Sequence, residues 1–264
     1  AQPAGDAERA YRAGTGLLNR GLNDLAADEY RAFLLDHPDH PKAPSARYGL
    51  AVCLVRMNNF TQAAAELDRI PPDASFEFLP DALQLRAQCC LSLSDAAGAV
   101  TRLKALLRNH PDFASADAAA ALLGEAQYST GAAADASQTL AALLEKHPSS
   151  PSAERAAYLL ALCEAALGRD TAAVARLSQW QATYPSSPLA PHAALTRAQC
   201  LHRAGDSDGA LTQYAKVLET GNPAVVPDAM LGKAQLLRAA GRIDAAVELL
   251  VDLREQSPTA PVLP

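Results

Sequence analysis

The sequence predicts an all-α protein built from about seven pairs of helices, and three observations lead to this fold class. Alanine accounts for 59 of the 264 residues, and it is the strongest helix former and a poor strand former. Apolar content reaches 49%, enough to bury a substantial core. One alanine recurs every 36 or 37 residues, a period typical of repeat architectures. These anchor alanines are Ala26, Ala63, Ala99, Ala136, Ala173, Ala210 and Ala246.

The first helix of each repeat is predicted to end five residues before the anchor alanine. That position mostly holds glycine, which accepts a left-handed helix stop at low cost. The seven residues are Gly21, Asn58, Ser94, Gly131, Gly168, Gly205 and Gly241. Seven residues earlier every repeat has glycine or alanine, so two helices are expected to approach closely there. These small residues are Gly14, Ala51, Ala87, Gly124, Ala161, Ala198 and Ala234.

The second helix of each repeat is predicted to bury one apolar stripe, because large apolar residues follow the anchor alanine at four and seven residues. The pairs are Tyr30/Phe33, Leu67/Ile70, Leu103/Leu106, Leu140/Leu143, Leu177/Trp180, Tyr214/Val217 and Leu250/Leu253. This helix then ends near a proline, as at Pro38 and Pro185, since the residue before proline avoids the α region. In the second repeat Pro71 and Pro72 should end it early, followed by an irregular joint at residues 76–79.

The repeat pattern resembles the tetratricopeptide repeat. Its order of small residue, glycine, alanine, leucine and proline is complete at Ala161, Gly168, Ala173, Leu177 and Pro185. The resemblance implies a right-handed superhelical solenoid whose concave groove is lined by the first helices. The long period and the Pro-Ser-Ser-Pro type of turn are similar to the periplasmic members, the Tol-Pal-associated and outer-membrane assembly proteins.

The repeats define the expected domain organisation. Residues 1–5 are predicted to be an N-terminal tail, residues 6–257 a solenoid of seven repeats, and residues 258–264 a C-terminal tail or linker. The last helix carries more apolar residues than one buried stripe needs, namely Val247, Leu249, Leu250, Val251 and Leu253. Because an end repeat requires a cap, we expect the tail, a second copy or a further domain to cover this helix. Self-association through the C-terminal repeat is therefore one expectation.

Charge and motif content exclude several classes of function. The net charge is −6 and no block of Lys or Arg occurs, which argues against a nucleic-acid partner. No apolar stretch is long enough to insert into a membrane. Phosphate-binding, dinucleotide-binding, zinc-protease and serine-hydrolase motifs are all missing from the sequence. Four of the five cysteines share one repeat position and are expected to pack in the core. We therefore predict no catalytic residues, no metal and no cofactor.

The residues expected to bind a partner lie on the first helices and face the concave groove. They combine tyrosine, glutamine and arginine, which protein interfaces tend to use. The predicted set is Tyr11, Tyr48, Val55, Arg56, Gln88, Leu91, Glu125, Tyr128, Tyr158, Gln199, His202, Arg203, Gln235 and Arg238. For any one of them, an ordinary exposed helix position is the alternative interpretation.

The resemblance implies a non-enzymatic scaffold that binds a protein or peptide, in a bacterial cell envelope. The start Ala-Gln-Pro-Ala-Gly, without Met, is consistent with a cleaved signal peptide and so with a periplasmic location. A chain trimmed at this point would look the same, so a cytoplasmic location stays open. One alternative function is a docking or sensor module of a longer multidomain protein. Another is a hydrolase, which would need a carboxylate pair such as Glu125 and Glu164.

Overall fold

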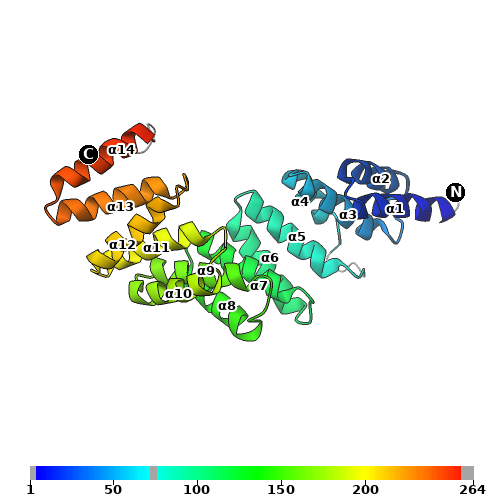
Figure 1. Cartoon of the computed structure of the whole chain (residues 1–264). Helices are drawn as coiled ribbons and strands as arrows, with labels where there is room; N and C mark the ends of the chain where they lie inside the picture. Colours follow the sequence, from blue (N-terminus) through cyan, green and yellow to red (C-terminus); the bar gives the residue numbers. More distant parts are fainter. Residues whose placement is uncertain (1–3, 72–75, 257–264) are drawn as a thin grey trace. The chain divides into compact units, whose positions relative to one another are not determined.

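The computed structural model describes residues 4–71 and 76–256, which form helices and their connections without any strand (Figure 1). The chain divides into two compact units, residues 1–132 and 133–264. The first contains α1 (Ala4–Asn19), α2 (Asn23–Asp36), α3 (Ala43–Arg56), α4 (Phe60–Asp68), α5 (Leu79–Ser92), α6 (Ala96–Asn109) and α7 (Ala116–Ser129). The second contains α8 (Ala133–Lys146), α9 (Ala153–Ala166), α10 (Asp170–Thr183), α11 (Ala190–Arg203), α12 (Ser207–Glu219), α13 (Val226–Ala239) and α14 (Ile243–Gln256). The predicted all-α fold of helix pairs is confirmed.

The predicted helix stops are found at the turns inside the repeats. Gly21, Gly131, Gly168, Gly205 and Gly241 have φ between 72° and 86°. Asn58 and Ser94, which replace glycine in two repeats, adopt the same left-handed backbone with φ of 61° and 63°. The backbone therefore reverses at the same point in every repeat, and within each unit the second helix packs back onto the first, as α2 does on α1 and α10 on α9.

The anchor alanines and the apolar stripes form the core. Six anchor alanines are fully buried, and Ala246 in the last repeat is 4% exposed. The residues seven positions further on, from Phe33 to Leu253, are buried in all seven repeats. The small anchors and the large side chains one and two turns later on the same helix are thus buried together in the core, as the periodicity predicts.

The second repeat departs from the others as expected. Its second helix, α4, has 9 residues where the other helices have 13 to 16. Phe76 packs against the core of the first unit, and Phe78 is the N-cap residue of α5.

The ends of the described chain differ slightly from the predicted boundaries. Helix α1 begins at Ala4, two residues before the predicted start of the solenoid. Asp6 lies in the first turn of α1, where a negative charge interacts favourably with the helix dipole. The predicted tail at 258–264 lies outside the described residues.

The five cysteines are all buried and free, which confirms the core assignment of the four that share one repeat position, Cys53, Cys89, Cys163 and Cys200. Burial raises the pKa of the Cys163 and Cys200 thiols to about 11. These thiols therefore stay protonated at neutral pH and are poor nucleophiles.

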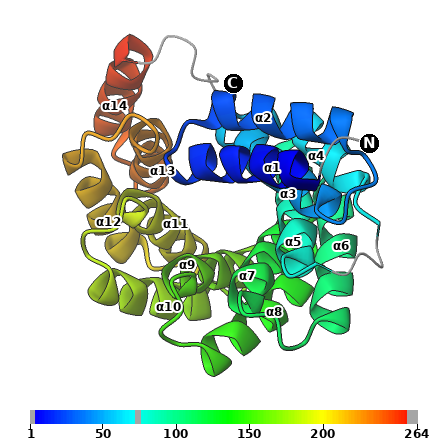
Figure 2. The ribbon, with the colours of Figure 1, turned by 90° about the vertical axis from the view of Figure 1, so that its right-hand side faces the viewer.

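Within each unit the first helices lie closer together than the second helices. In the first unit α1, α3, α5 and α7 contact one another in succession, and in the second unit α9, α11 and α13 do the same. Successive second helices make no such contact among the described residues. Figure 2 shows the second unit with α9, α11 and α13 on one side and α10 and α12 on the other. Each unit therefore curves toward its first helices.

The N-terminus of α12 carries a side-chain cap. The Asp206 Oδ1 atom accepts a hydrogen bond of 2.9 Å from the backbone N–H of Gly209, at the start of α12. We expect Asp206→Ala to lower the free energy of unfolding by about 1 kcal/mol, because one helix N–H loses its partner. Asp206→Asn retains an acceptor and should stay close to wild type. Urea unfolding followed by circular dichroism measures both, and equal stability of all three proteins would contradict the cap.

Candidate partner-binding site

The first-helix face of a unit is the surface that its odd-numbered helices contribute. All fourteen predicted partner-binding residues lie on these helices, and none of them is buried. Tyr11 through Tyr128 belong to the first unit, and Tyr158 through Arg238 belong to the second. The structure thus leaves every predicted side chain at least partly accessible, but it gives them different neighbours.

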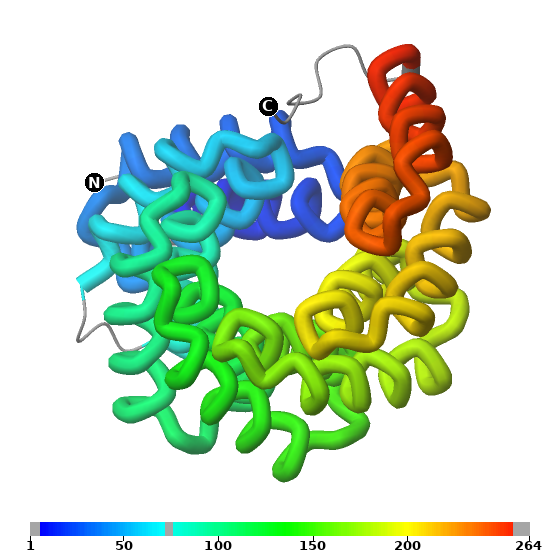
Figure 3. The backbone as a smooth tube through the Cα atoms, turned by 90° about the vertical axis from the view of Figure 1, so that its left-hand side faces the viewer, coloured from blue at the N-terminus to red at the C-terminus, as the bar shows by residue number. Residues whose placement is uncertain are grey.

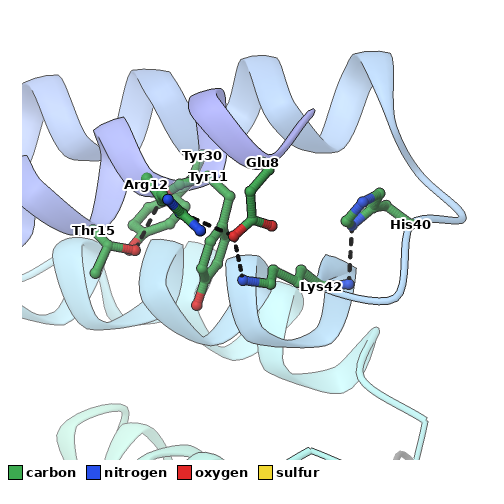
Figure 4. Close-up of polar contacts among 7 residues, drawn as sticks. All are labelled: Glu8, Tyr11, Arg12, Thr15, Tyr30, His40 and Lys42. Carbon is green, nitrogen blue, oxygen red and sulfur yellow. Dashed lines mark hydrogen bonds and ion pairs between the residues drawn. The ribbon is translucent and has the colours of Figure 1, made fainter. Parts of the chain in front are cut away.

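Tyr11 is held by contacts within the first unit (Figure 4). Its ring lies 6.1 Å from the ring of Tyr30, and the Lys42 Nζ atom sits 4.6 Å from its centroid. Lys42 Nζ also donates to the Glu8 Oε1 atom at 2.9 Å, which Arg12 Nε contacts at 3.0 Å. The hydrogen bond from Lys42 lowers the pKa of the Glu8 carboxyl. A cation therefore already occupies one face of the Tyr11 ring.

Tyr48 forms an aromatic pair that the sequence did not reveal. Its ring stacks on Phe78 with centroids 5.9 Å apart and an interplanar angle of 15°. Phe78 is 43% exposed. Tyr48 is partly buried, and this burial raises the pKa of its hydroxyl. Because Phe78 precedes α5 and Tyr48 lies on α3, the two rings present an aromatic surface where these helices meet.

Arg56 and Arg203 occupy the same repeat position, and both reach back to the preceding repeat. Arg203 Nη2 lies 2.6 Å from Oδ1 of Asp170, in the first turn of α10. Arg56 Nη1 donates a long hydrogen bond of 3.4 Å to the backbone oxygen of Leu18 and another of 3.5 Å to Asn23. Asn23 and Asp170 are themselves equivalent, each three residues before an anchor alanine. Both arginines therefore join neighbouring repeats.

A groove between α11 and α13 brings four of the predicted residues together. Gln199, His202 and Arg203 line it from α11, and Gln235 lines it from α13. Its volume is about 490 Å³, and the further lining residues are Tyr214, Asp228, Leu231 and Gly232. Because it brings predicted residues from two first helices together, this groove is the candidate partner-binding site.

Gly232 makes the groove possible because the Tyr214 ring fills the space beside it. A Cβ atom at Gly232 would lie 2.5 Å from both Cζ and the hydroxyl oxygen of Tyr214. Tyr214 is 2% exposed, and burial raises the pKa of its hydroxyl. The ring therefore forms a floor between the two helices at the point where another repeat would have a side chain.

The other predicted residues lie on first helices of both units. Tyr158 lies 5.6 Å, centroid to centroid, from the buried Trp180. The rest are distributed over four helices: Val55 on α3, Gln88 and Leu91 on α5, Glu125 and Tyr128 on α7, and Arg238 on α13. Their roles as partner contacts stay predictions.

Gly232 and Tyr214 were not among the residues predicted to bind a partner, although the sequence holds a signal for them. Tyrosine occurs four residues after the anchor alanine only in the first and sixth repeats. In both cases the next repeat has glycine fourteen residues before its anchor, Gly49 and Gly232. A Cβ atom at Gly49 would meet Tyr30 at the same 2.5 Å. A search for residues that change together between neighbouring repeats would have found both pairs.

The described residues contain no group of three or more His, Cys, Asp or Glu side chains placed to hold a metal ion. No helix among them has the length and apolar content needed to cross a lipid bilayer.

Comparison with solved structures finds helical repeat proteins along nearly the whole chain. A tetratricopeptide repeat protein from Parabacteroides merdae is 15% identical, with a TM-score of 0.66 over 96% of this chain and 94% of its own. The C-terminal part of a repeat-containing protein from Cytophaga hutchinsonii is 14% identical, with a TM-score of 0.68 over 94% and 96%. YrrB, described as a TPR protein with an unusual peptide-binding site, is 19% identical, with a TM-score of 0.58 over 68% and 87%.

Sequence comparison assigns the family. No curated protein matches the sequence. The YfiO family of outer membrane lipoproteins matches residues 80–193. The tetratricopeptide repeat family matches residues 11–77 and 195–261, which together are just over half of the chain. The regular anchor alanines, the left-handed stops and this match lead to one conclusion: the chain belongs to the tetratricopeptide repeat family.

Proposed function

We propose that this protein is a non-enzymatic scaffold that binds a protein or peptide partner on its first-helix face, in a bacterial cell envelope. The observation that carries the proposal is the groove between α11 and α13. Its volume of about 490 Å³ lies within the range of ligand sites, about 300–1,000 Å³. Four residues chosen from the sequence as partner contacts line it.

The groove has the chemistry to hold an extended peptide. Gln199 and Gln235 stand at the same position in successive repeats, eleven residues before their anchor alanines. A side-chain amide both donates and accepts hydrogen bonds, so each glutamine can pair with a peptide N–H and C=O. His202 and Asp228 add polar groups at the edge, and Leu231 adds apolar surface. The peptide-binding site named for YrrB supports a peptide as the class of ligand.

The cell-envelope part of the proposal has a separate basis. It rests on the resemblance of residues 80–193 to outer membrane lipoproteins. The non-enzymatic part rests on membership of a family of scaffolds. In the first unit we place further partner contacts at Tyr48 and its neighbour Phe78, whose stacked rings are partly exposed.

A capture experiment tests the groove. The variant Gln199→Ala, His202→Ala, Gln235→Ala removes three groove side chains that make no hydrogen bond within the described part of the chain. A partner captured from envelope extract by the wild type, and identified by mass spectrometry, should bind this variant at least about tenfold more weakly. The matched control is Gln62→Ala, Gln138→Ala, His147→Ala, which alters the same residue types at exposed positions outside the first helices.

Three outcomes of the capture experiment separate the parts of the proposal. Loss of binding in the groove variant alone, with unchanged helical content, supports the groove. Equal binding by the groove variant and the control moves the partner site away from α11 and α13. A partner captured from cytosolic extract, but not from envelope extract, contradicts the cell-envelope assignment.

A further inference from the structure

The outer face of α14 carries an apolar stripe that the described residues of its own unit leave exposed. Ile243, Val247 and Leu250 are 52%, 54% and 42% exposed, and Arg254 continues the same helix face. The spacings of four, three and four residues place these four side chains, here called the α14 stripe, in one line. Figure 3 shows α14 in red beside α13 in orange. Among the described residues α13 is the helix that α14 packs against.

The other repeats show what normally covers this position. Leu250 stands four residues after its anchor alanine, and its six equivalents are at most 6% exposed. In each case the first helix of the next repeat packs on the second helix, as α3 packs on α2 and α13 on α12. The short connections make each such pair antiparallel. The α14 stripe is therefore shaped to receive one antiparallel helix.

The charges on α14 identify a second α14 as that helix. In an antiparallel pair centred between Val247 and Leu250, these two residues of one copy face Leu250 and Val247 of the other. Arg254 then lies beside the first turn of the other copy, where Asp244 is exposed. Neither Asp244 nor Arg254 forms an ion pair within the described residues. An apolar centre with one Arg–Asp pair at each end is complementary to itself, as a twofold interface requires.

The opposite end of the chain is a poorer partner for the stripe. Stacking of α1 from another copy on α14 would bring Arg12 to Leu250, because Arg12 holds the position of Gly49 and Gly232 in later repeats. Arg12 is exposed and already paired with Glu8 at 3.0 Å. Covering its guanidinium with an apolar residue would remove the charge from water at a cost. Head-to-tail stacking is thus disfavoured relative to α14 against α14.

We propose that two copies of this protein associate through their α14 helices, which pair antiparallel along the α14 stripe. The interface consists of Ile243, Val247 and Leu250 from both copies, flanked by the pairs Arg254–Asp244. Val251, 42% exposed beside the stripe, extends the apolar contact. The association does not depend on the groove between α11 and α13.

Sedimentation across a range of protein concentrations tests the proposal. The wild type should form a dimer, and Leu250→Asp should raise the dimer Kd at least about tenfold. The matched control is Leu35→Asp, at a leucine of α2 that is 81% exposed. It should dimerise like the wild type, with circular dichroism confirming that both variants fold. A wild type that stays monomeric at the highest soluble concentration would overturn the proposal.

A charge exchange tests the antiparallel geometry. Arg254→Asp places two acidic residues at each end of the pair, and Asp244→Arg places two arginines there, so each variant alone should dimerise less well. An equimolar mixture of the two variants should form a heterodimer, because each acidic end then meets a basic end. The double variant Asp244→Arg, Arg254→Asp should also regain dimerisation. Single variants that dimerise like the wild type, or a mixture without heterodimer, would refute the proposed pairing.

Discussion

Ala173→Trp should lower the free energy of unfolding by about 1–3 kcal/mol or more, because the anchor position leaves no room for an indole ring. Ala173 is fully buried where α10 packs on α9. A large side chain there has to push the two helices apart or leave its preferred rotamer. Ala136→Trp should have the same effect, since Ala136 is the fully buried anchor of α8.

Ala172→Trp is the matched control for the anchor position. Ala172 is the neighbour of Ala173 on the same helix, but its side chain is exposed. Its replacement should change the free energy of unfolding by no more than about 0.5 kcal/mol. Urea unfolding followed by circular dichroism provides the comparison. If Ala173→Trp and Ala136→Trp unfold like the wild type, the anchor alanines do not set the helix packing.

The fold could be predicted from the sequence because its determinants are local and occur seven times. A left-handed stop requires a residue that tolerates positive φ, and Gly168 or Asn58 shows this without knowledge of its surroundings. The anchor alanines likewise depend on side-chain size alone. Seven copies in register make the pattern visible even where one repeat deviates, as α4 does at Pro71.

The candidate site could be predicted only in part, because its residues depend on neighbours from other repeats. The position of Arg203 on a first helix follows from its spacing, but its pairing with Asp170 depends on how two repeats stack. Tyr11 is covered by Lys42, which lies 31 residues away in the sequence. Phe78 was assigned to an irregular joint, and its stacking on Tyr48 needs the three-dimensional structure. The contacts of Tyr11 with Lys42 and of Tyr48 with Phe78 therefore leave no periodic trace in the sequence.

Gly232→Leu should lower the free energy of unfolding by about 3 kcal/mol or more. Its Cβ would meet the Tyr214 ring at 2.5 Å, and that ring is 2% exposed and cannot move aside into solvent. The loss should occur although leucine favours helices over glycine by roughly 0.5–1 kcal/mol. Gly16→Leu is the matched control, because Gly16 lies in α1 and a Cβ atom added there would have no neighbouring atom within 4 Å. It should be neutral or slightly stabilising.

The pairing of Tyr214 with Gly232 predicts that a second substitution rescues the first. Tyr214→Leu alone should lose about 1–3 kcal/mol, because a cavity opens beside Gly232. The double variant Tyr214→Leu, Gly232→Leu recreates the pair found at Leu103 and Leu122, which pack in one core cluster. Its loss should therefore be smaller than the sum of the two single losses by at least about 1 kcal/mol. Additive losses in urea unfolding would mean that the two side chains do not share this space, and the floor of the groove would then need another explanation.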